Sequence, residues 1–197
     1  SGKVVAGEQD EGIETAQALL LDRATHLRGD PQALSDLEPT AKYVLLKGQE
    51  VLTKSETELA LLSQGDMLAM GCENQRQTFL GILSDSGTAV FGVDLLEEAD
   101  APSGTAFIET RTSAPLFSRI ENELALHATA LAQWQRRTSY CNLCGGATNF
   151  VDGATCCRCT ECNTPSWPRQ DPSMIAVISS RKGDRVLLAH STRHPPK

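Results

Sequence analysis

Two Cys-x-x-Cys pairs lie close together in this chain, and 14 residues separate them. Zinc in structural sites is bound by four ligands at the corners of a tetrahedron, and each Cys-x-x-Cys turn can supply two neighbouring corners. Gly145 and Asn163 directly follow the pairs, and both residue types tolerate the left-handed backbone that closes such a turn. Four thiols leave no position for water, so the pattern predicts a structural zinc site rather than a catalytic one. The predicted ligands are Cys141, Cys144, Cys159 and Cys162.

The choice of the second pair has an alternative. Cys156 and Cys157 lie just before it, and Cys156 with Cys159 also forms a Cys-x-x-Cys pair. We favour the pair ending at Cys162 because Asn163 follows it, whereas Thr160 after Cys159 is a poor left-handed residue. The sequence leaves open whether Cys156 or Cys157 takes the place of one of these zinc ligands.

Other roles for the cysteines fit less well. A secreted disulfide scaffold spreads its cysteines through the fold, yet the first 140 residues contain only Cys72. A redox Cys-x-x-Cys requires a thioredoxin-like βαβ setting, which is absent from the pattern. Free thiols indicate a reducing compartment, so we expect an intracellular protein, most readily a cytoplasmic one.

The charge and hydrophobicity of the chain exclude some classes of binding partner. The 197 residues carry a formal net charge of -7, and 40% of them are hydrophobic. This acidity argues against a general nucleic-acid binder or a membrane-surface protein, both of which present basic faces. A transmembrane helix needs about 20 consecutive apolar residues, and no run approaches that length, so we expect no membrane partner.

The first 110 residues predict a mostly antiparallel sheet with early helical pieces. Apolar spacing favours a helix over 13–27, and Asp30 followed by Pro31 predicts a short capped helix over 31–37. A β-hairpin is expected over 43–52 around Lys47-Gly48-Gln49, and residues 59–62 fit either a helical turn or a strand. The remaining predicted strands are 67–70, 78–83, 89–94 and 107–109.

The strongest helical pattern covers residues 116–137. Ile120, Leu124, Ala128 and Leu131 form one apolar stripe at helical spacing. We expect Trp134 to join this helix to the cysteine module, and we expect His127 to be an interfacial side chain rather than a ligand.

After the cysteine module the sequence predicts a proline-bounded joint over 166–172 and then a β-hairpin. Its apolar strands are 174–179 and 185–189, around the turn Arg181-Lys182-Gly183-Asp184. A single hairpin does not make a stable domain. We therefore expect that the part which covers these strands is missing or is supplied by a partner.

This succession of segments resembles the NADH pyrophosphatase branch of the Nudix hydrolases. The segments that carry the resemblance are Leu21 to Arg28, Cys141 to Cys162, Trp167-Pro168-Arg169, Asp171-Pro172 and Gly183 to Ala189. The resemblance implies an α+β fold with a β-rich N-terminal domain over 1–138 and a four-cysteine zinc ribbon over 139–170. It also implies that residues 171–197 are the first β-hairpin of an incomplete Nudix domain of α/β/α type.

Members of this family hydrolyse the pyrophosphate bond of NADH or NAD to a nicotinamide mononucleotide and AMP, and some remove NAD caps from RNA. The resemblance implies a homodimer, a structural zinc on the four cysteines and a catalytic magnesium or manganese. It also places Trp167 where the family has an aromatic side chain that stacks on a base of the dinucleotide, and an aromatic face suits that role. An ordinary packing role for Trp167 at the joint is equally compatible with the sequence.

The family's catalytic element, the Nudix box, is absent from the 197 residues. Gly92 and Glu98 have its first spacing, but Ala106 stands where the box needs arginine. We therefore expect the intact enzyme to be a Nudix NAD(H) diphosphatase and this chain alone to be inactive. The alternative is a catalytically dead zinc-ribbon module for binding or dimerisation. A zinc-ribbon nucleic-acid adaptor is disfavoured because Lys and Arg are scarce around the cysteines.

Overall fold

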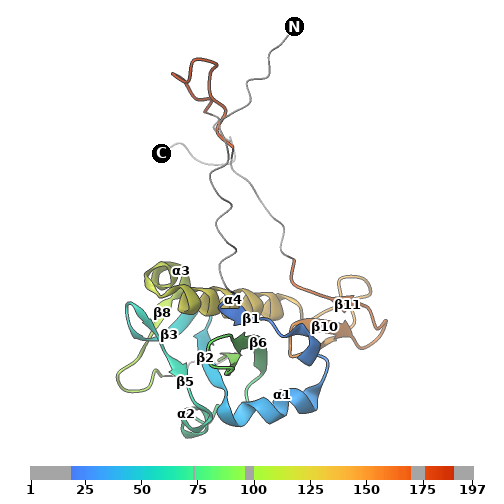
Figure 1. Cartoon of the computed structure of the whole chain (residues 1–197). Coiled ribbons are helices and arrows are strands. Elements are labelled where there is room, and N and C mark those ends of the chain that lie inside the picture. Colours follow the sequence, from blue (N-terminus) through green and yellow to red (C-terminus); the bar gives the residue numbers. More distant parts are fainter. Residues whose placement is uncertain (1–18, 73, 96–99, 170–175, 189–197) are drawn as a thin grey trace.

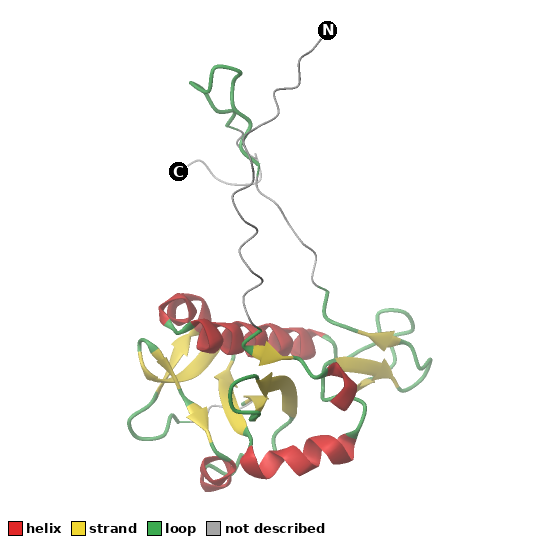
Figure 2. Ribbon diagram, viewed as in Figure 1, coloured by secondary structure: helices red, strands yellow, loops and turns green. Residues whose placement is uncertain are grey.

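A computed structural model describes residues 19–72, 74–95, 100–169 and 176–188. One eight-stranded sheet lies between two layers of helices, and a three-stranded sheet stands beside it (Figures 1 and 2). The predicted α+β class is confirmed. The strands of the large sheet are β1 (Leu21–Asp22), β2 (Lys42–Lys47), β3 (Glu50–Ser55), β4 (Glu58–Leu59), β5 (Leu61–Leu62), β6 (Gln77–Leu83), β7 (Ala89–Asp94) and β8 (Ala106–Glu109).

The helices are short except for one. They are α1 (Pro31–Leu37), α2 (Gln64–Ala69), α3 (Thr110–Ser113) and α4 (Arg119–Arg137), with 3₁₀ turns η1 (Thr25–Leu27), η2 (Glu38–Thr40) and η3 (Ala114–Leu116). Among the residues that the structure describes, no helix is both long and apolar enough to cross a bilayer.

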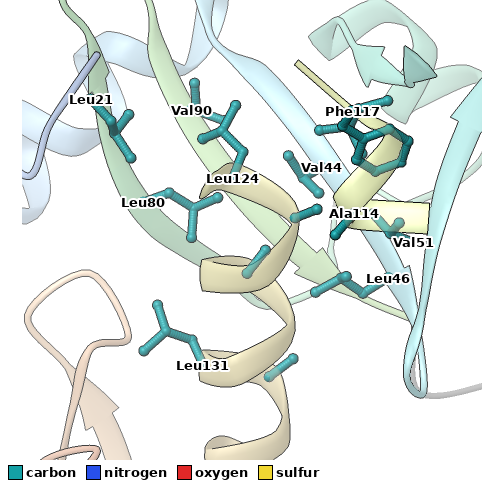
Figure 3. Close-up of a cluster of buried hydrophobic side chains, with 14 residues drawn as sticks. Leu21, Val44, Leu46, Val51, Leu80, Val90, Ala114, Phe117, Leu124 and Leu131 are labelled. Carbon is teal, nitrogen blue, oxygen red and sulfur yellow. The ribbon is translucent and has the colours of Figure 1, made fainter. Parts of the chain in front are cut away.

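Alternating side chains of the central strands fill two separate cores. In β2, Val44 and Leu46 face α4, whereas Tyr43 and Leu45 face the layer that contains α1 and α2. Successive side chains of a strand point to opposite faces, so a strand apolar at every position is buried on both. Figure 3 shows the first core, where the α4 side chains meet those of the sheet.

The strand order is β1-β6-β7-β2-β3-β4, with β5 paired to β2 and β8 paired to β3. The hairpin of β2 and β3 is confirmed, and residues 59–62 are extended rather than helical. One feature differs from the expected antiparallel sheet, because β2 and β7 run parallel. Four strands and helix α2 separate β2 from β7 along the chain, and periodicity alone does not fix the relative direction of these two strands.

Two element predictions were wrong. Residues 67–69 belong to helix α2 and Met70 caps its end, since Ser63 and Asp66 form a reciprocal capping box that starts a helix there. The segment 19–24 contains strand β1, where Leu21 pairs with Leu83, rather than the end of a helix. The part of that predicted helix over 13–18 lies outside the described residues.

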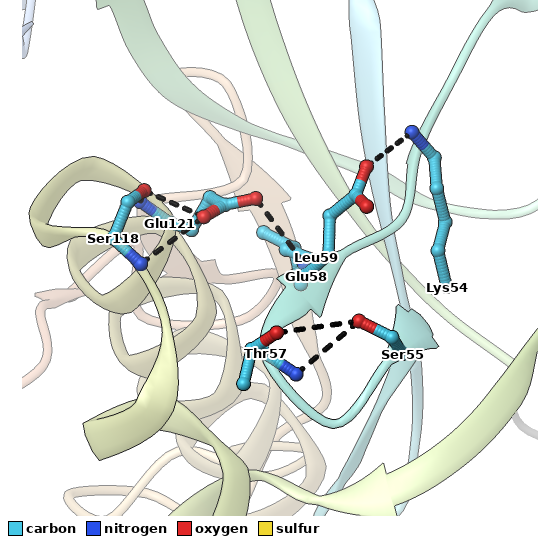
Figure 4. A network of polar contacts seen from close by, with 7 residues as sticks. All are labelled: Lys54, Ser55, Thr57, Glu58, Leu59, Ser118 and Glu121. Carbon is cyan, nitrogen blue, oxygen red and sulfur yellow. Dashed lines mark hydrogen bonds and ion pairs between the residues drawn. The ribbon is translucent and has the colours of Figure 1, made fainter.

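Helix α4 begins three residues later than expected. Ser118 caps it, and the Glu121 carboxylate accepts a hydrogen bond from the Ser118 N–H at 3.1 Å. Figure 4 shows that the same carboxylate also accepts from the Leu59 N–H, at 3.2 Å. Glu121 thereby ties the start of the helix to the edge of the sheet. The apolar stripe of this helix is confirmed, with Leu124, Ala128 and Leu131 buried.

The last described segment, 176–188, forms the predicted turn and a minimal hairpin. Ser179 bridges Val186, and Gly183 has a φ of 73° in the turn. Its apolar side chains are exposed, with Val177 at 76% and Leu188 at 85%. The ends of the two predicted strands, 174–175 and 189, lie outside the described residues.

Candidate metal centre and adjoining cleft

The small sheet carries the cysteines. Its strands are β9 (Thr148–Val151), β10 (Cys156–Cys159) and β11 (Pro165–Ser166), in the order β11-β10-β9. The Cys-x-x-Cys turns precede β9 and follow β10, so the β9–β10 hairpin brings its two distant ends together. Gly145 and Asn163 have φ values of 77° and 58°, which confirms the left-handed turn closures expected from the sequence.

Four cysteine sulfurs gather at this end of the small sheet. The Sγ atoms of Cys141, Cys144, Cys159 and Cys162 all lie within 4.8 Å of one another. The Cys141–Cys162 separation is 3.7 Å, and Cys144 lies 3.4 Å from both Cys159 and Cys162. A tetrahedron with Zn–S bonds of about 2.3 Å has edges of about 3.8 Å. The donor set and its spacing therefore fit a zinc ion.

Backbone N–H groups point at these sulfurs, as expected for thiolate ligands. The Leu143 N–H donates to Cys141 Sγ and the Glu161 N–H donates to Cys159 Sγ, both at 3.4 Å. Hydrogen bonds to the charged form stabilise a thiolate. The arrangement thus favours ionised sulfur and a bound cation.

The two exposed thiols of the cluster differ in acidity. Hydrogen bonding with Thr164 lowers the pKa of the Cys162 thiol to about 6. The Gly146 N–H lowers the pKa of Cys144, but the sulfurs of Cys162 and Cys159 outweigh it and raise that pKa to about 12.

Cys156 and Cys157 stand outside the cluster. Both are fully buried in β10, and the Cys156 thiol donates to the Cys157 carbonyl oxygen at 3.4 Å. Burial raises the pKa of Cys156, which disfavours its thiolate. The structure therefore gives neither residue the setting of a metal ligand.

The β9–β10 turn docks on the N-terminal domain. The Gly153 carbonyl oxygen accepts from the Phe79 N–H at 2.9 Å, and Gln135 Nε2 donates to the Ala154 carbonyl oxygen at 2.8 Å. Trp134 meets Phe150 edge-on, with ring centroids 5.7 Å apart. The expected packing of Trp134 between the helix and the cysteine module is confirmed.

A cleft of about 480 Å³ opens between η1, α4 and the segment that follows β11. Trp167 lines it and is 58% exposed, so its ring is not packed away in the joint. Arg28, His127 and Asp152 line the same cleft. Burial lowers the pKa of His127 to about 4, and the charges of Arg23 and Arg28 act in the same direction, so its imidazole is neutral near pH 7.

Sequence reasoning gave no individual role to Arg23, Arg28 or Asp152. The two arginines lie in a segment that the family resemblance singled out, but their neighbours do not indicate what they contact. About 100 residues separate Arg23 from Glu123, its partner at 3.1 Å. These residues come together only through the fold, so their spacing along the chain does not predict the group.

A family model for the NADH pyrophosphatase-like rudimentary NUDIX domain matches residues 40–134. The matched range runs from the start of β2 to the last turn of α4 and contains most of the eight-stranded sheet.

Similar proteins agree with this match. The NAD-capped RNA hydrolase NudC of Photobacterium profundum is 36% identical over 72 residues, which are 36% of this chain and 26% of the relative. Nudix hydrolase 19, chloroplastic, of Arabidopsis thaliana is 28% identical over 131 residues, 60% of this chain and 30% of the relative. The NudC of Stutzerimonas stutzeri is 27% identical over 122 residues, 59% of this chain and 44% of the relative.

The matched part of the chain thus spans between 26% and 44% of the length of these relatives. The family match lies in the large sheet and its covering helix, the part of the molecule on which the cysteine module docks. Through this N-terminal domain the chain is therefore similar to the NADH pyrophosphatase branch of the Nudix hydrolases.

Proposed function

We propose that this chain supplies the N-terminal domain and a structural zinc ribbon to a Nudix hydrolase of NAD-type dinucleotides. The full reaction adds water across the pyrophosphate bond of NADH or NAD and releases a nicotinamide mononucleotide and AMP. The observation that carries the proposal is the match over 40–134 beside a tetrahedral group of four thiols. Similarity to hydrolases of NAD-capped RNA extends the proposed substrates to such RNA ends.

The metal ligands in this proposal are Cys141, Cys144, Cys159 and Cys162. A zinc ion there cross-links the two ends of the β9–β10 hairpin and so contributes folding free energy. The catalytic Mg²⁺ or Mn²⁺ belongs to a Nudix box, which the 197 residues do not contain, so we propose that they are inactive alone. The proposed division places the ribbon at 139–170 and the first Nudix hairpin at 171–197.

Trp167 is proposed to stack on a base of the dinucleotide, because its ring is exposed at a cleft large enough for part of such a ligand. A homodimer in a reducing compartment, most readily the cytoplasm, completes the proposal. The dimer rests on the family resemblance. The compartment rests on the cysteines, none of which forms a disulfide in the structure.

The test measures zinc per chain and AMP release from NADH with Mg²⁺ or Mn²⁺ on one preparation. A chimera in which the C-terminal part of the Photobacterium relative follows residue 170 is assayed in parallel. One zinc, an inactive chain and an active chimera are the expected results. AMP release by the chain alone would contradict the proposed inactivity, and absence of zinc would contradict the ribbon. A zinc-loaded but inactive chimera would favour the alternative of a binding or dimerisation module.

A further inference from the structure

Buried polar atoms without a hydrogen-bond partner concentrate at one place in the molecule. Four such side-chain atoms occur in the described part of the chain, and three of them are Arg23 Nη1, Arg28 Nε and His127 Nε2. An unsatisfied buried polar group costs about 1–3 kcal/mol, and more if charged. Each such atom in a native structure calls for an explanation, and a catalytic role or a bound ion is among the explanations.

The three residues form one group. The charges of Arg23 and Arg28 both lower the pKa of His127, in addition to burial. Desolvation lowers the pKa of Arg28, and like-charge repulsion from Arg23 adds to this effect. Glu123 pairs with Arg23 on one side, at 3.1 Å. Among the described residues, the Arg28 side chain makes one hydrogen bond, a long contact of 3.5 Å from Nη1 to Thr155 Oγ1. Arg28 and His127 line the 480 Å³ cleft that Trp167 borders.

We propose that this cleft binds the phosphate of a nucleoside 5′-phosphate, or of its anhydride, through Arg28 and His127 while the base stacks on Trp167. A guanidinium presents several donors that match phosphate oxygens. The neutral imidazole adds one N–H donor when Nε2 carries the proton. The inference rests on the proposed function for the role of Trp167 and assigns part of the substrate site to the N-terminal domain.

Asp152 offers a test of whether Arg28 binds an anion. It lines the cleft, and its carboxylate raises the pKa of Arg28 electrostatically, so it competes with any anion for the arginine. Its backbone has a φ of 53°, which asparagine tolerates well. Asp152→Asn therefore removes the competing charge with little strain and is expected to tighten phosphate binding.

The experiment is calorimetric titration of the zinc-loaded chain with AMP and with adenosine. We expect AMP to bind about 10-fold more tightly than adenosine, because one hydrogen-bonded charge pair between the phosphate and Arg28 contributes about that much affinity. Arg28→Gln should remove this preference, and Arg28→Lys should restore part of it. Arg158→Gln, an exposed arginine on the ribbon, is the matched control and should leave the preference unchanged. Trp167→Ala should weaken both ligands equally.

Equal affinities for AMP and adenosine in the wild type, with Asp152→Asn without effect, would overturn the phosphate site and leave base stacking on Trp167 standing. This comparison holds even if Arg28→Gln fails to fold. Binding of a single-stranded RNA oligonucleotide without binding of AMP would also overturn the inference. If neither AMP nor adenosine binds, the proposed phosphate site is wrong. The proposed function is tested separately by the zinc content of the chain and by hydrolysis with the chimera.

Discussion

Gln135 Nε2 donates to two acceptors at once, the Ala154 carbonyl oxygen and Thr78 Oγ1, each at 2.8 Å. The glutamine comes from helix α4, the threonine from strand β6 and the alanine from the turn of the cysteine module. All three groups are buried. This one amide therefore fixes the ribbon to the domain that the family match covers.

Replacing Gln135 with methionine should weaken that junction. Methionine keeps much of the volume but leaves two buried oxygens without a donor, which we expect to cost about 2–4 kcal/mol of unfolding free energy. Urea unfolding followed by circular dichroism measures the loss. Gln32→Met is the control, because the Gln32 side chain is exposed and donates to the exposed Asp36 carboxylate. Equal stabilities of the two variants would contradict the role of Gln135.

We expect that any side chain at Gly153 weakens the docking of the β9–β10 turn on the N-terminal domain. It has a φ of 61°, and a Cβ there would lie 2.9 Å from Phe79 Cβ. Gly153→Ala should therefore suffer both backbone strain and a clash, with an expected loss of about 2–4 kcal/mol. Thermal unfolding checks this value.

Gly87→Ala isolates the backbone part of that cost. Gly87 has a φ of 67°, but a Cβ there would meet nothing within 4 Å. We expect this control to lose only about 1 kcal/mol. If the two alanine variants unfold at the same temperature, the close contact between the ribbon turn and Phe79 does not exist in solution.

Local signals explain which elements the sequence could predict. Asp30 accepts from the N–H groups of Gln32 and Ala33, so the short helix α1 begins and ends where its cap and composition indicate. Gly145 and Asn163 likewise adopt the left-handed backbone that their positions require. In each case the decisive interaction lies within a few residues of the chain.

Failures arose where distant contacts or competing local signals decide. The apolar residues Met67 and Met70 suggested a strand, but the capping box at Ser63 imposes a helix with Met67 on its buried face. Leu21 lies inside the predicted helix over 13–27, yet its pairing with Leu83 makes it part of a sheet edge. The cleft beside Trp167 was unpredictable for the same reason, since Arg28, His127 and Trp167 come together only in the folded chain.

Removal of single thiols tests the metal centre. Cys159→Ser should abolish stoichiometric zinc binding and lower the unfolding temperature, because one corner of the tetrahedron is lost. Cys157→Ser is the matched control two residues away in the same strand, and it should retain one zinc per chain. Metal analysis and thermal unfolding on both variants give the answer.

The choice between the two possible second pairs needs a second comparison. Cys162→Ser should release zinc and Cys156→Ser should not, since only the Cys162 sulfur lies near Cys141 and Cys144. The opposite result would show that Cys156 is the ligand. A chelator should destabilise the wild type and the Cys156→Ser protein alike.

His127 should make stability depend on pH below neutrality. Its pKa is lowered from 6.5 to about 4 by burial and by the charges of Arg23 and Arg28. Between these two values the folded chain binds fewer protons at this site than the unfolded chain. The unfolding free energy therefore falls as pH falls from 6.5 to about 4, by at most about 3 kcal/mol from this group. His127→Gln should flatten that part of the pH profile in urea unfolding, whereas His26→Gln, an exposed control, should keep the wild-type slope. A slope unchanged by His127→Gln would mean that the imidazole is not held neutral between the arginines.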